Sequence, residues 1–170
     1  LMMNKPPGYE CSRKPKHHPS VLSLLPSPYC NREVQRIVRL DEDSTRLLLL
    51  SDLGALIHKL TSPKRHVPKV YVVDCAEPVT PAQLTQLLGG VVLHDDPLPV
   101  RAAACVASSE RQLQLTLTEG KYHQVKRMVA AAGNHVATLQ RSDFGALQLP
   151  PDLAAGQWRW VERAAIAPGL

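Results

Sequence analysis

Residues 111–134 read RQLQLTLTEGKYHQVKRMVAAAGN and contain two successive periodicities. Leucines alternate with polar residues at positions 113, 115 and 117, which is typical of a half-exposed strand over 111–118. Beyond the Glu-Gly pair, apolar residues recur at helical spacing, at Val125, Met128, Val129 and Ala132. Gly133 and Asn134 then form a helix stop. The stretch therefore predicts a strand followed by an amphipathic helix.

Further strands are predicted on both sides of this stretch. Leu47 to Ser51 has no polar face, and Lys69 to Cys75 has β-branched and aromatic content, with Tyr71 among apolar neighbours. Shorter strands are indicated at 1–4, 135–140, 146–149 and 158–161, helices at 55–60 and from Pro81 to Gly89, and a basic loop with six prolines at 5–28. Because regular βαβ alternation is missing, we expect one α+β domain over residues 1–170, with a mixed, mainly antiparallel sheet, a few short helices and a central cleft.

The composition restricts the class of protein. The chain has 170 residues, and 20 Lys and Arg against 15 Asp and Glu give a formal net charge of +5. With 44% hydrophobic and 21% charged residues, its composition is ordinary for a globular protein. No apolar run approaches the roughly 18 residues that span a bilayer, so we expect no membrane association. The four cysteines are far apart and form no CxxC pair. This spacing favours a reducing, cytoplasmic location.

Two segments have the side chains needed for chemistry. Residues 39–46, RLDEDSTR, place acids directly before the leucine run, where functional carboxylates are often found. On composition alone, a capped turn made by Asp43 or Ser44 is the better explanation of these acids. Residues 119–128 are dense in basic and amide groups. On a helix, Lys126 lies beside the apolar stripe and could reach a carboxylate, whereas Arg127 points away and, fully exposed, could meet phosphate. A solvated helix face is the plain alternative.

Several motifs together resemble the ribosomal small-subunit type of RNA pseudouridine synthase. They are NKPPGY at 4–9, RLD at 39–41 with the leucines at 47–50, TSP at 61–63 with KVY at 69–71, EGKYHQVKRM at 119–128, and GNH at 133–135. The resemblance implies the pseudouridine synthase fold and isomerisation of a uridine in ribosomal RNA. The N1–C1′ bond breaks, the base rotates, and a C5–C1′ bond forms. No cofactor and no metal are implied.

The resemblance also implies roles for individual residues. Asp41 matches the catalytic aspartate, which attacks either the sugar C1′ or the base C6, and Tyr71 matches the tyrosine that stacks on the flipped base. Lys126 matches the basic residue that pairs with the aspartate. A carboxylate nucleophile must be ionised, and a nearby ammonium favours that state. The expected substrate-binding residues are Arg39, Leu139, Gln124, Lys121 and Arg127.

The chain departs from the family pattern at two glycines and at its N-terminal side. Val38 and Arg46 stand where the family usually has glycine, so a positive φ or a close RNA approach there would be strained. The family commonly carries an S4-like RNA-binding domain ahead of the Lys-Pro motif, and the resemblance covers the catalytic domain without it. We expect the phosphate contacts to be Arg13, Lys14, Lys16, Lys64, Arg65, Lys121 and Arg127.

Other functions fit the sequence less well. A non-catalytic ribosomal RNA-binding protein would not need Asp41, Tyr71 and Lys126 to converge, and seven aromatic residues are few for a surface that stacks many bases. A zinc site from Cys11, His17, His18 and Cys30 lacks compact ligand spacing. We expect a monomer acting on ribosomal RNA. The resemblance favours 16S small-subunit RNA as the target, with large-subunit RNA as the alternative.

Overall fold

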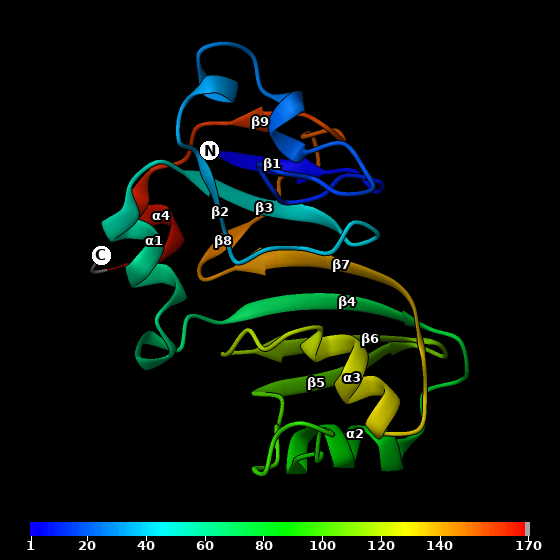
Figure 1. Cartoon of the computed structure of the whole chain (residues 1–170). Coiled ribbons are helices and arrows are strands. Elements are labelled where there is room, and N and C mark those ends of the chain that lie inside the picture. Colours follow the sequence, from blue (N-terminus) through cyan, green and yellow to red (C-terminus); the bar gives the residue numbers. More distant parts are fainter. Residues whose placement is uncertain (169–170) are drawn as a thin grey trace.

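The computed structural model describes residues 1–168, which form a nine-stranded sheet in the order β5-β6-β4-β7-β3-β1-β9, with β2 paired to β3 and β8 to β7 (Figure 1). The strands are β1 (Met2–Lys5), β2 (Gln35–Ile37), β3 (Thr45–Ser51), β4 (Lys69–Cys75), β5 (Ala104–Ser109), β6 (Gln112–Leu117), β7 (Val136–Phe144), β8 (Leu147–Gln148) and β9 (Trp158–Arg159). β3 and β7 run parallel, and the other paired strands run antiparallel. The expected α+β class and the mixed, mainly antiparallel sheet are confirmed.

Strand β3 is buried on both faces, as its unbroken leucines predict. Leu48 and Leu50 belong to one hydrophobic cluster, and Leu47 and Leu49 belong to a second cluster on the opposite face. All four are at most 1% exposed. Because β3 lies inside the sheet, between β1 and β7, the residues that precede it are held against the middle of the molecule.

Strand β4 has the predicted two faces. Tyr71, Val73 and Cys75 are buried, whereas the residues between them are half-buried. Lys69 shares the buried face, with 4% of its surface exposed, which the sequence pattern did not indicate. Tyr71 faces Leu115 of β6 on one side and Arg141 of β7 on the other. β7 is longer than the predicted 135–140 strand because its pairing with β4 continues through the polar residues to Phe144.

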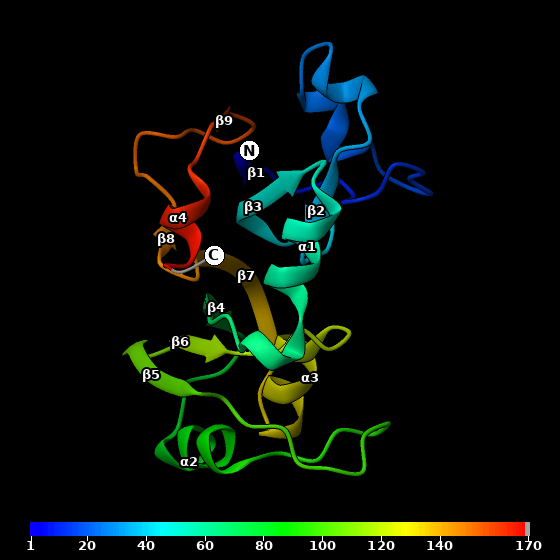
Figure 2. The ribbon, with the colours of Figure 1, turned by 90° about the vertical axis from the view of Figure 1, so that its left-hand side faces the viewer.

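The helices are short and lie around the sheet. They are α1 (Gly54–Thr61), α2 (Pro81–Gly89), α3 (Gln124–Ala131) and α4 (Arg163–Ile166), with 3-10 turns at Val21–Leu24, Tyr29–Asn31 and Pro63–Arg65. In the side view, α3 and the basic loop lie on one side of the sheet and α4 lies on the other (Figure 2). As predicted, Thr80 caps α2, here in a capping box with Gln83. No helix of the described residues is long and apolar enough to cross a membrane.

Two irregular segments shape the face that carries α3. In the basic loop, the Glu10 carboxylate accepts hydrogen bonds from the backbone N–H groups of residues 16–18, and these bonds lower the pKa of Glu10 to about 2. Before α3, His123 has a left-handed backbone (φ 46°), so the helix begins at Gln124 rather than directly after Gly120. Residues 121–123 therefore form a turn that projects from the helix start.

Candidate active site

A pocket of about 770 Å³ opens beside the middle of the sheet. The loop before β3, the end of α1, strand β4 and the turn before α3 all contribute to its wall. The expected central cleft is therefore present. Seven of the eight residues that the sequence predicts for the site line it: Arg39, Asp41, Tyr71, Lys121, Gln124, Lys126 and Leu139. Arg127 is not among the lining residues.

Two basic side chains hold the carboxylate of Asp41 in this pocket. His123 Nε2 lies 3.0 Å from Asp41 Oδ1, and Lys126 Nζ lies 3.4 Å from Asp41 Oδ2. The Asp41 side chain is 15% exposed, so the carboxylate faces a partly desolvated space. The pairing of Lys126 with Asp41 agrees with the sequence. The contribution of His123 was missed, because it depends on the left-handed turn at that residue.

Lys126 is shared between two acids. Its Nζ donates hydrogen bonds to both oxygens of Asp43, at 2.9 and 3.2 Å. Burial opposes the charge on Lys126, but the hydrogen bond to Asp43 and the charges of both aspartates outweigh it and raise the pKa of Lys126 above its usual 10.5. Lys126 is therefore an ammonium at any physiological pH. Asp43, which the sequence offered only as a turn cap, fixes the position of that ammonium.

The loop that carries Asp41 is tied down by Lys5. This side chain is fully buried, and its Nζ donates to the backbone carbonyls of Pro6 (3.1 Å), Glu42 (3.2 Å) and Ser44 (2.7 Å). The N–H of Gly8 also donates to the carbonyl of Glu42, at 2.7 Å. The NKPPGY motif therefore positions the aspartate loop, a role that sequence reasoning did not assign to it.

Arg141 of β7 supports the same loop from the other side, and sequence reasoning also missed it. The residue is 0% exposed. Its Nε donates to the carbonyl of Leu47, and its Nη2 donates to the carbonyl of Val38, both at 2.9 Å. Arg141 thus connects β7, β3 and the segment that leads to Asp41. Its Nη1 is buried and has no hydrogen-bond partner among the described residues.

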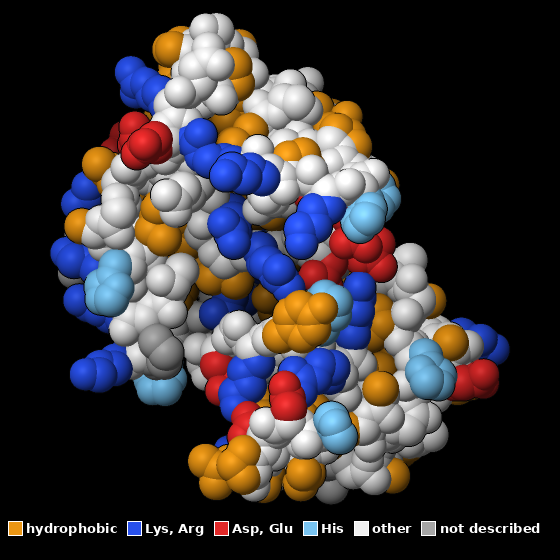
Figure 3. All heavy atoms as spheres, viewed as in Figure 1, with side chains coloured by type: hydrophobic (Ala, Val, Ile, Leu, Met, Phe, Trp, Pro, Cys, Tyr) orange, Lys and Arg blue, Asp and Glu red, His pale blue; other side chains and the backbone are white. Residues whose placement is uncertain are grey.

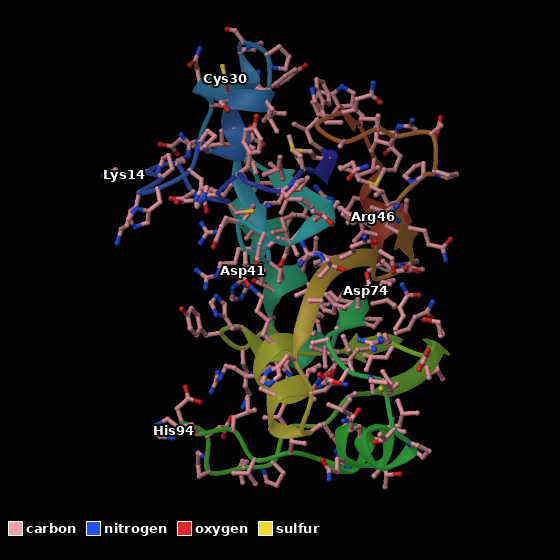
Figure 4. All side chains as sticks on the ribbon, turned by 90° about the vertical axis from the view of Figure 1, so that its right-hand side faces the viewer. Lys14, Cys30, Asp41, Arg46, Asp74 and His94 are labelled. Atoms are coloured by element: carbon pink, nitrogen blue, oxygen red, sulfur yellow. The ribbon has the colours of Figure 1, made fainter. Side chains whose placement is uncertain are left out.

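Both residues that replace the family glycines have a positive φ, 54° at Val38 and 81° at Arg46. This backbone region is uncommon for residues with a Cβ and is a true outlier for a β-branched side chain such as valine. The expected strain is therefore present at both ends of the Asp41 loop. Figure 4 shows Arg46 on the side of the sheet away from Lys14, so a close RNA approach is not needed to explain that position.

Tyr71 and Leu139 belong to the apolar part of the pocket wall. Each is 7% exposed, and both belong to the larger hydrophobic cluster. They lie on the neighbouring strands β4 and β7, where Leu139 pairs with Val73. A flat apolar group could therefore rest between the strand floor and the Asp41 carboxylate, as the sequence-based assignment of these two residues requires.

A stack of three side chains lies at the rim of the pocket. The guanidinium of Arg39 lies over the ring of Tyr122, 5.2 Å from its centroid. Tyr122 stacks in turn on His123, with the ring centroids 4.0 Å apart. Tyr122 is 65% exposed, which is unusual for an aromatic side chain. The stack links the exposed rim directly to Asp41 through His123.

Three of the predicted substrate-binding side chains already have partners in the chain. Lys121 forms an ion pair with Asp96, and Arg127 forms one with Asp95. The prediction of a fully exposed Arg127 is wrong, because its side chain is only 24% exposed and also donates to the carbonyl of Tyr122. The Gln124 amide accepts a hydrogen bond from the Lys121 N–H and donates one to Glu119. The Gln124 side chain therefore stabilises the turn that contains His123.

The face around Asp41 is rich in basic side chains. Lys and Arg side chains gather along the hollowed middle of this face, with a small acidic group among them (Figure 3). In Figure 4, Asp41 lies between the loop that carries Lys14 and the loop that carries His94, which project on the same side of the molecule. Within residues 1–168, no group of three or more His, Cys, Asp or Glu side chains could hold a metal ion.

The fold, the basic face and the paired Asp41 carboxylate in a partly apolar pocket together define a candidate active site, and comparison with known proteins gives the family. Residues 1–131 match the family model described as RNA pseudouridylate synthase. The chain belongs to this family.

Individual relatives agree with the family match. The chain is 41% identical over 167 residues to the ribosomal small subunit pseudouridine synthase A of Escherichia coli (strain K12), covering 98% of this chain and 72% of the relative. A crystal structure of a pseudouridylate synthase superposes with a TM-score of 0.91 at 36% identity, covering 97% of this chain and 70% of that one. An archaeal box H/ACA sRNP Nop10–Cbf5 complex matches with a TM-score of 0.62 at 17% identity, covering 92% of this chain and 50% of that one, and shows the fold alone.

Proposed function

We propose that this chain converts a specific uridine of small-subunit ribosomal RNA to pseudouridine, with Asp41 as its nucleophile. The observation that carries the proposal is the convergence of Asp41, Tyr71 and Lys126 on one pocket, with Lys126 Nζ 3.4 Å from the Asp41 carboxylate. An RNA-binding protein without activity would not need this arrangement. The relatives named for the small ribosomal subunit support the choice of RNA.

The site offers side chains suited to the extrusion of the base and to the nucleophilic attack. A base inside folded RNA must be extruded before its glycosidic bond can react, and the pocket offers Tyr71 and Leu139 as apolar contacts for the flipped ring. Asp41 attacks C1′ or C6 as an ionised carboxylate, which Lys126 and His123 orient. The N1–C1′ bond then breaks and the base turns. C5 bonds to C1′, the bond between the Asp41 oxygen and carbon breaks and returns the free carboxylate, the proton on C5 is lost, and N1 gains a proton.

RNA contacts extend beyond the pocket. We assign phosphate contacts to Arg13, Lys14, Lys16, Lys64, Arg65, Lys121 and Arg127, of which the last two must exchange their aspartate partners for phosphate. Affinity should fall steeply between low and moderate salt because counterions are released on binding.

We further propose that residues 1–170 form one catalytic domain, which acts as a monomer in the cytoplasm. The described cysteines are all free, as a reducing location requires.

Mapping of pseudouridine in ribosomal RNA from cells with and without this protein tests the target. The expected result is one small-subunit position that loses pseudouridine when the protein is absent and regains it with the wild-type gene but not with Asp41→Asn. A lost position in large-subunit RNA would move the substrate to that subunit. Maps that do not differ would leave a binding role and overturn the proposal.

A further inference from the structure

Lys69 is a buried cation inside the candidate active site that none of the roles above uses. The residue is 4% exposed and lines the same pocket as Asp41 and Tyr71. Among the described residues it donates no hydrogen bond and forms no ion pair. Its ammonium keeps some access to the pocket but has little water around it and no partner within residues 1–168, which is costly for a charged group. Lys5, the other buried lysine, satisfies three backbone carbonyls instead.

The surroundings of Lys69 carry an excess of positive charge. The Lys69 ammonium lies 5.9 Å from the centroid of the Phe144 ring, and the Arg141 guanidinium lies 5.4 Å from the same ring. Burial and the charge of Arg141 lower the pKa of Lys69 to about 8, against a smaller opposing effect of Glu119. Lys69 therefore remains mostly protonated at neutral pH, and the pocket wall presents one ammonium that lacks an acceptor.

The position of Lys69 matches one edge of a bound base. Lys69 and Tyr71 are two residues apart on the buried face of β4, about 6.5 Å from one Cα to the next on the same face. A base stacked on Tyr71 therefore has an edge within reach of the lysine side chain. Asp41 must meet C1′ or C6, on the sugar side of the nucleotide. In a base placed so, the edge away from the sugar would face the part of the pocket wall that carries Lys69, and in uracil that edge carries O4.

We propose that Lys69 donates a hydrogen bond to O4 of the flipped uracil and thereby selects uracil over cytosine. The inference rests on the proposed function, since it assigns a substrate contact in the same site. Uracil has a carbonyl acceptor at C4, whereas cytosine has an amino donor there. A lysine ammonium can only donate, so it pairs with uracil and leaves two opposed donors with cytosine.

The same contact would assist the reaction. When the N1–C1′ bond breaks, the electron pair remains on the base, and conjugation through C6, C5 and C4 places part of the charge on O4. An ammonium already in place at O4 stabilises that charge in a water-poor site. Lys69 should therefore affect both the choice of base and the rate of uridine conversion. A phosphate contact is less consistent with the burial of Lys69, because phosphates lie at the RNA surface.

The test uses short RNAs that span the mapped target and carry uridine, cytidine or the 2-pyrimidinone ribonucleoside, which lacks O4, at the target position. Binding of each RNA is measured for the wild type, Lys69→Met and Lys69→Arg. We expect the wild type to prefer uridine by about tenfold or more over both analogues. Lys69→Met should bind the three RNAs within about twofold of one another and convert uridine at least tenfold more slowly. Lys69→Arg should keep part of the preference.

Lys59→Met, at an exposed lysine of α1, is the matched control and should behave as the wild type. Thermal melts show whether each variant is folded. If Lys69→Met does not fold, the test compares the wild type with Lys69→Arg, which should keep only part of the preference for uridine over the two analogues. A wild type that does not distinguish uridine from the analogue without O4, or a folded Lys69→Met that keeps the full preference, would overturn the inference. Equal loss of affinity for all three RNAs would identify a phosphate contact and overturn it as well. A wild type that makes no pseudouridine would overturn the proposed function together with the inference.

Discussion

The ammonium of Lys126 lies 3.4 Å from one carboxylate oxygen of Asp41, across 85 residues of sequence. The two residues come from elements with no local connection, the loop before β3 and the helix α3. The Asp43 carboxylate also contacts the Lys126 ammonium, at 2.9 Å. Because Lys126 lies on α3 and both aspartates lie in the loop before β3, the site forms only when α3 packs beside the middle of the sheet.

The first prediction concerns the charge of Lys126. Lys126→Met removes the ammonium with little change in volume, so Asp41 keeps only His123 as a basic neighbour. We expect the single-turnover rate of pseudouridine formation to fall by about 10²-fold, because a charge that orients and stabilises the nucleophile is lost. Lys126→Arg should stay within about tenfold of the wild type. A rate for Lys126→Met within threefold of the wild type would show that the pair is not needed.

The second prediction concerns Lys5, the buried lysine with three carbonyl partners. Lys5→Met leaves the carbonyls of Pro6, Glu42 and Ser44 without their donor in a buried place. We expect the free energy of unfolding to fall by about 2–4 kcal/mol, measured by urea denaturation. The folded fraction should also lose activity, because these bonds hold the loop of Asp41. Full activity in the folded fraction would refute this positioning role.

The third prediction is the opposite effect at Lys69, where the ammonium has no partner to lose. Because the pKa of Lys69 falls from 10.5 to about 8 in the folded protein, the unfolded chain binds more protons between these pH values. The destabilisation of the folded protein by the Lys69 ammonium is therefore fully present below pH 8, and it decreases as the pH rises toward 10.5. After allowance for screening, Lys69→Met should raise the free energy of unfolding by about 1–2 kcal/mol at pH 7.

Urea denaturation at pH 7 and pH 10 measures both parts of this third prediction. At pH 7, Lys69→Met should raise the free energy of unfolding, whereas Lys5→Met should lower it. At pH 10, the increase from Lys69→Met should be smaller. Equal destabilisation by both substitutions at pH 7 would show that the different hydrogen bonding of the two lysines does not determine their contributions to the free energy of unfolding.

The fourth prediction concerns the strained backbone at Arg46. Glycine adopts φ 81° without a steric penalty, and the exposed Arg46 side chain forms no hydrogen bond or ion pair among the described residues. Relief of about 1–2 kcal/mol of strain against about 0.5–1 kcal/mol of chain entropy gives a net gain of about 0.5–1 kcal/mol for Arg46→Gly. Thr45→Gly, next to it in β3 and without a positive φ, should destabilise the protein. A lower melting temperature for Arg46→Gly would contradict the strain.

The sequence predicts the strands and helices well where the pattern is local. The alternating leucines of β6, the unbroken run of β3 and the Thr80 cap each depend on neighbouring residues only. The pairing of Asp41 with Lys126 needed a family resemblance, because no periodicity relates residues so far apart. The resemblance also identified Val38 and Arg46 as positions where a positive φ would be strained, and the structure has a positive φ at both.

What the sequence could not show depends on distant contacts. Arg127 was misplaced because a helical projection contains no information about Asp95, which lies in another loop. Lys5 and Arg141 support the site through backbone carbonyls, which have no sequence signature. Lys69 looked like an ordinary strand residue, since an alternating strand gives no sign that a lysine at its start is buried.

The central claim is that Asp41 performs the chemistry. Asp41→Asn keeps the shape of the side chain and removes the charge, so neither the attack on carbon nor the ion pair with Lys126 can survive. A carboxylate that only capped a turn would instead contribute about 1 kcal/mol of stability and leave turnover by the folded fraction nearly normal.

The measurement is single-turnover tritium release from 5-³H-uridine RNA by wild type and Asp41→Asn, with thermal melts and RNA affinity determined for both. We predict no detectable release by Asp41→Asn, with folding and RNA affinity largely intact. Residual activity within about tenfold of the wild type, a change of only about 1.4 kcal/mol in the barrier, would contradict the assignment of Asp41 as the nucleophile.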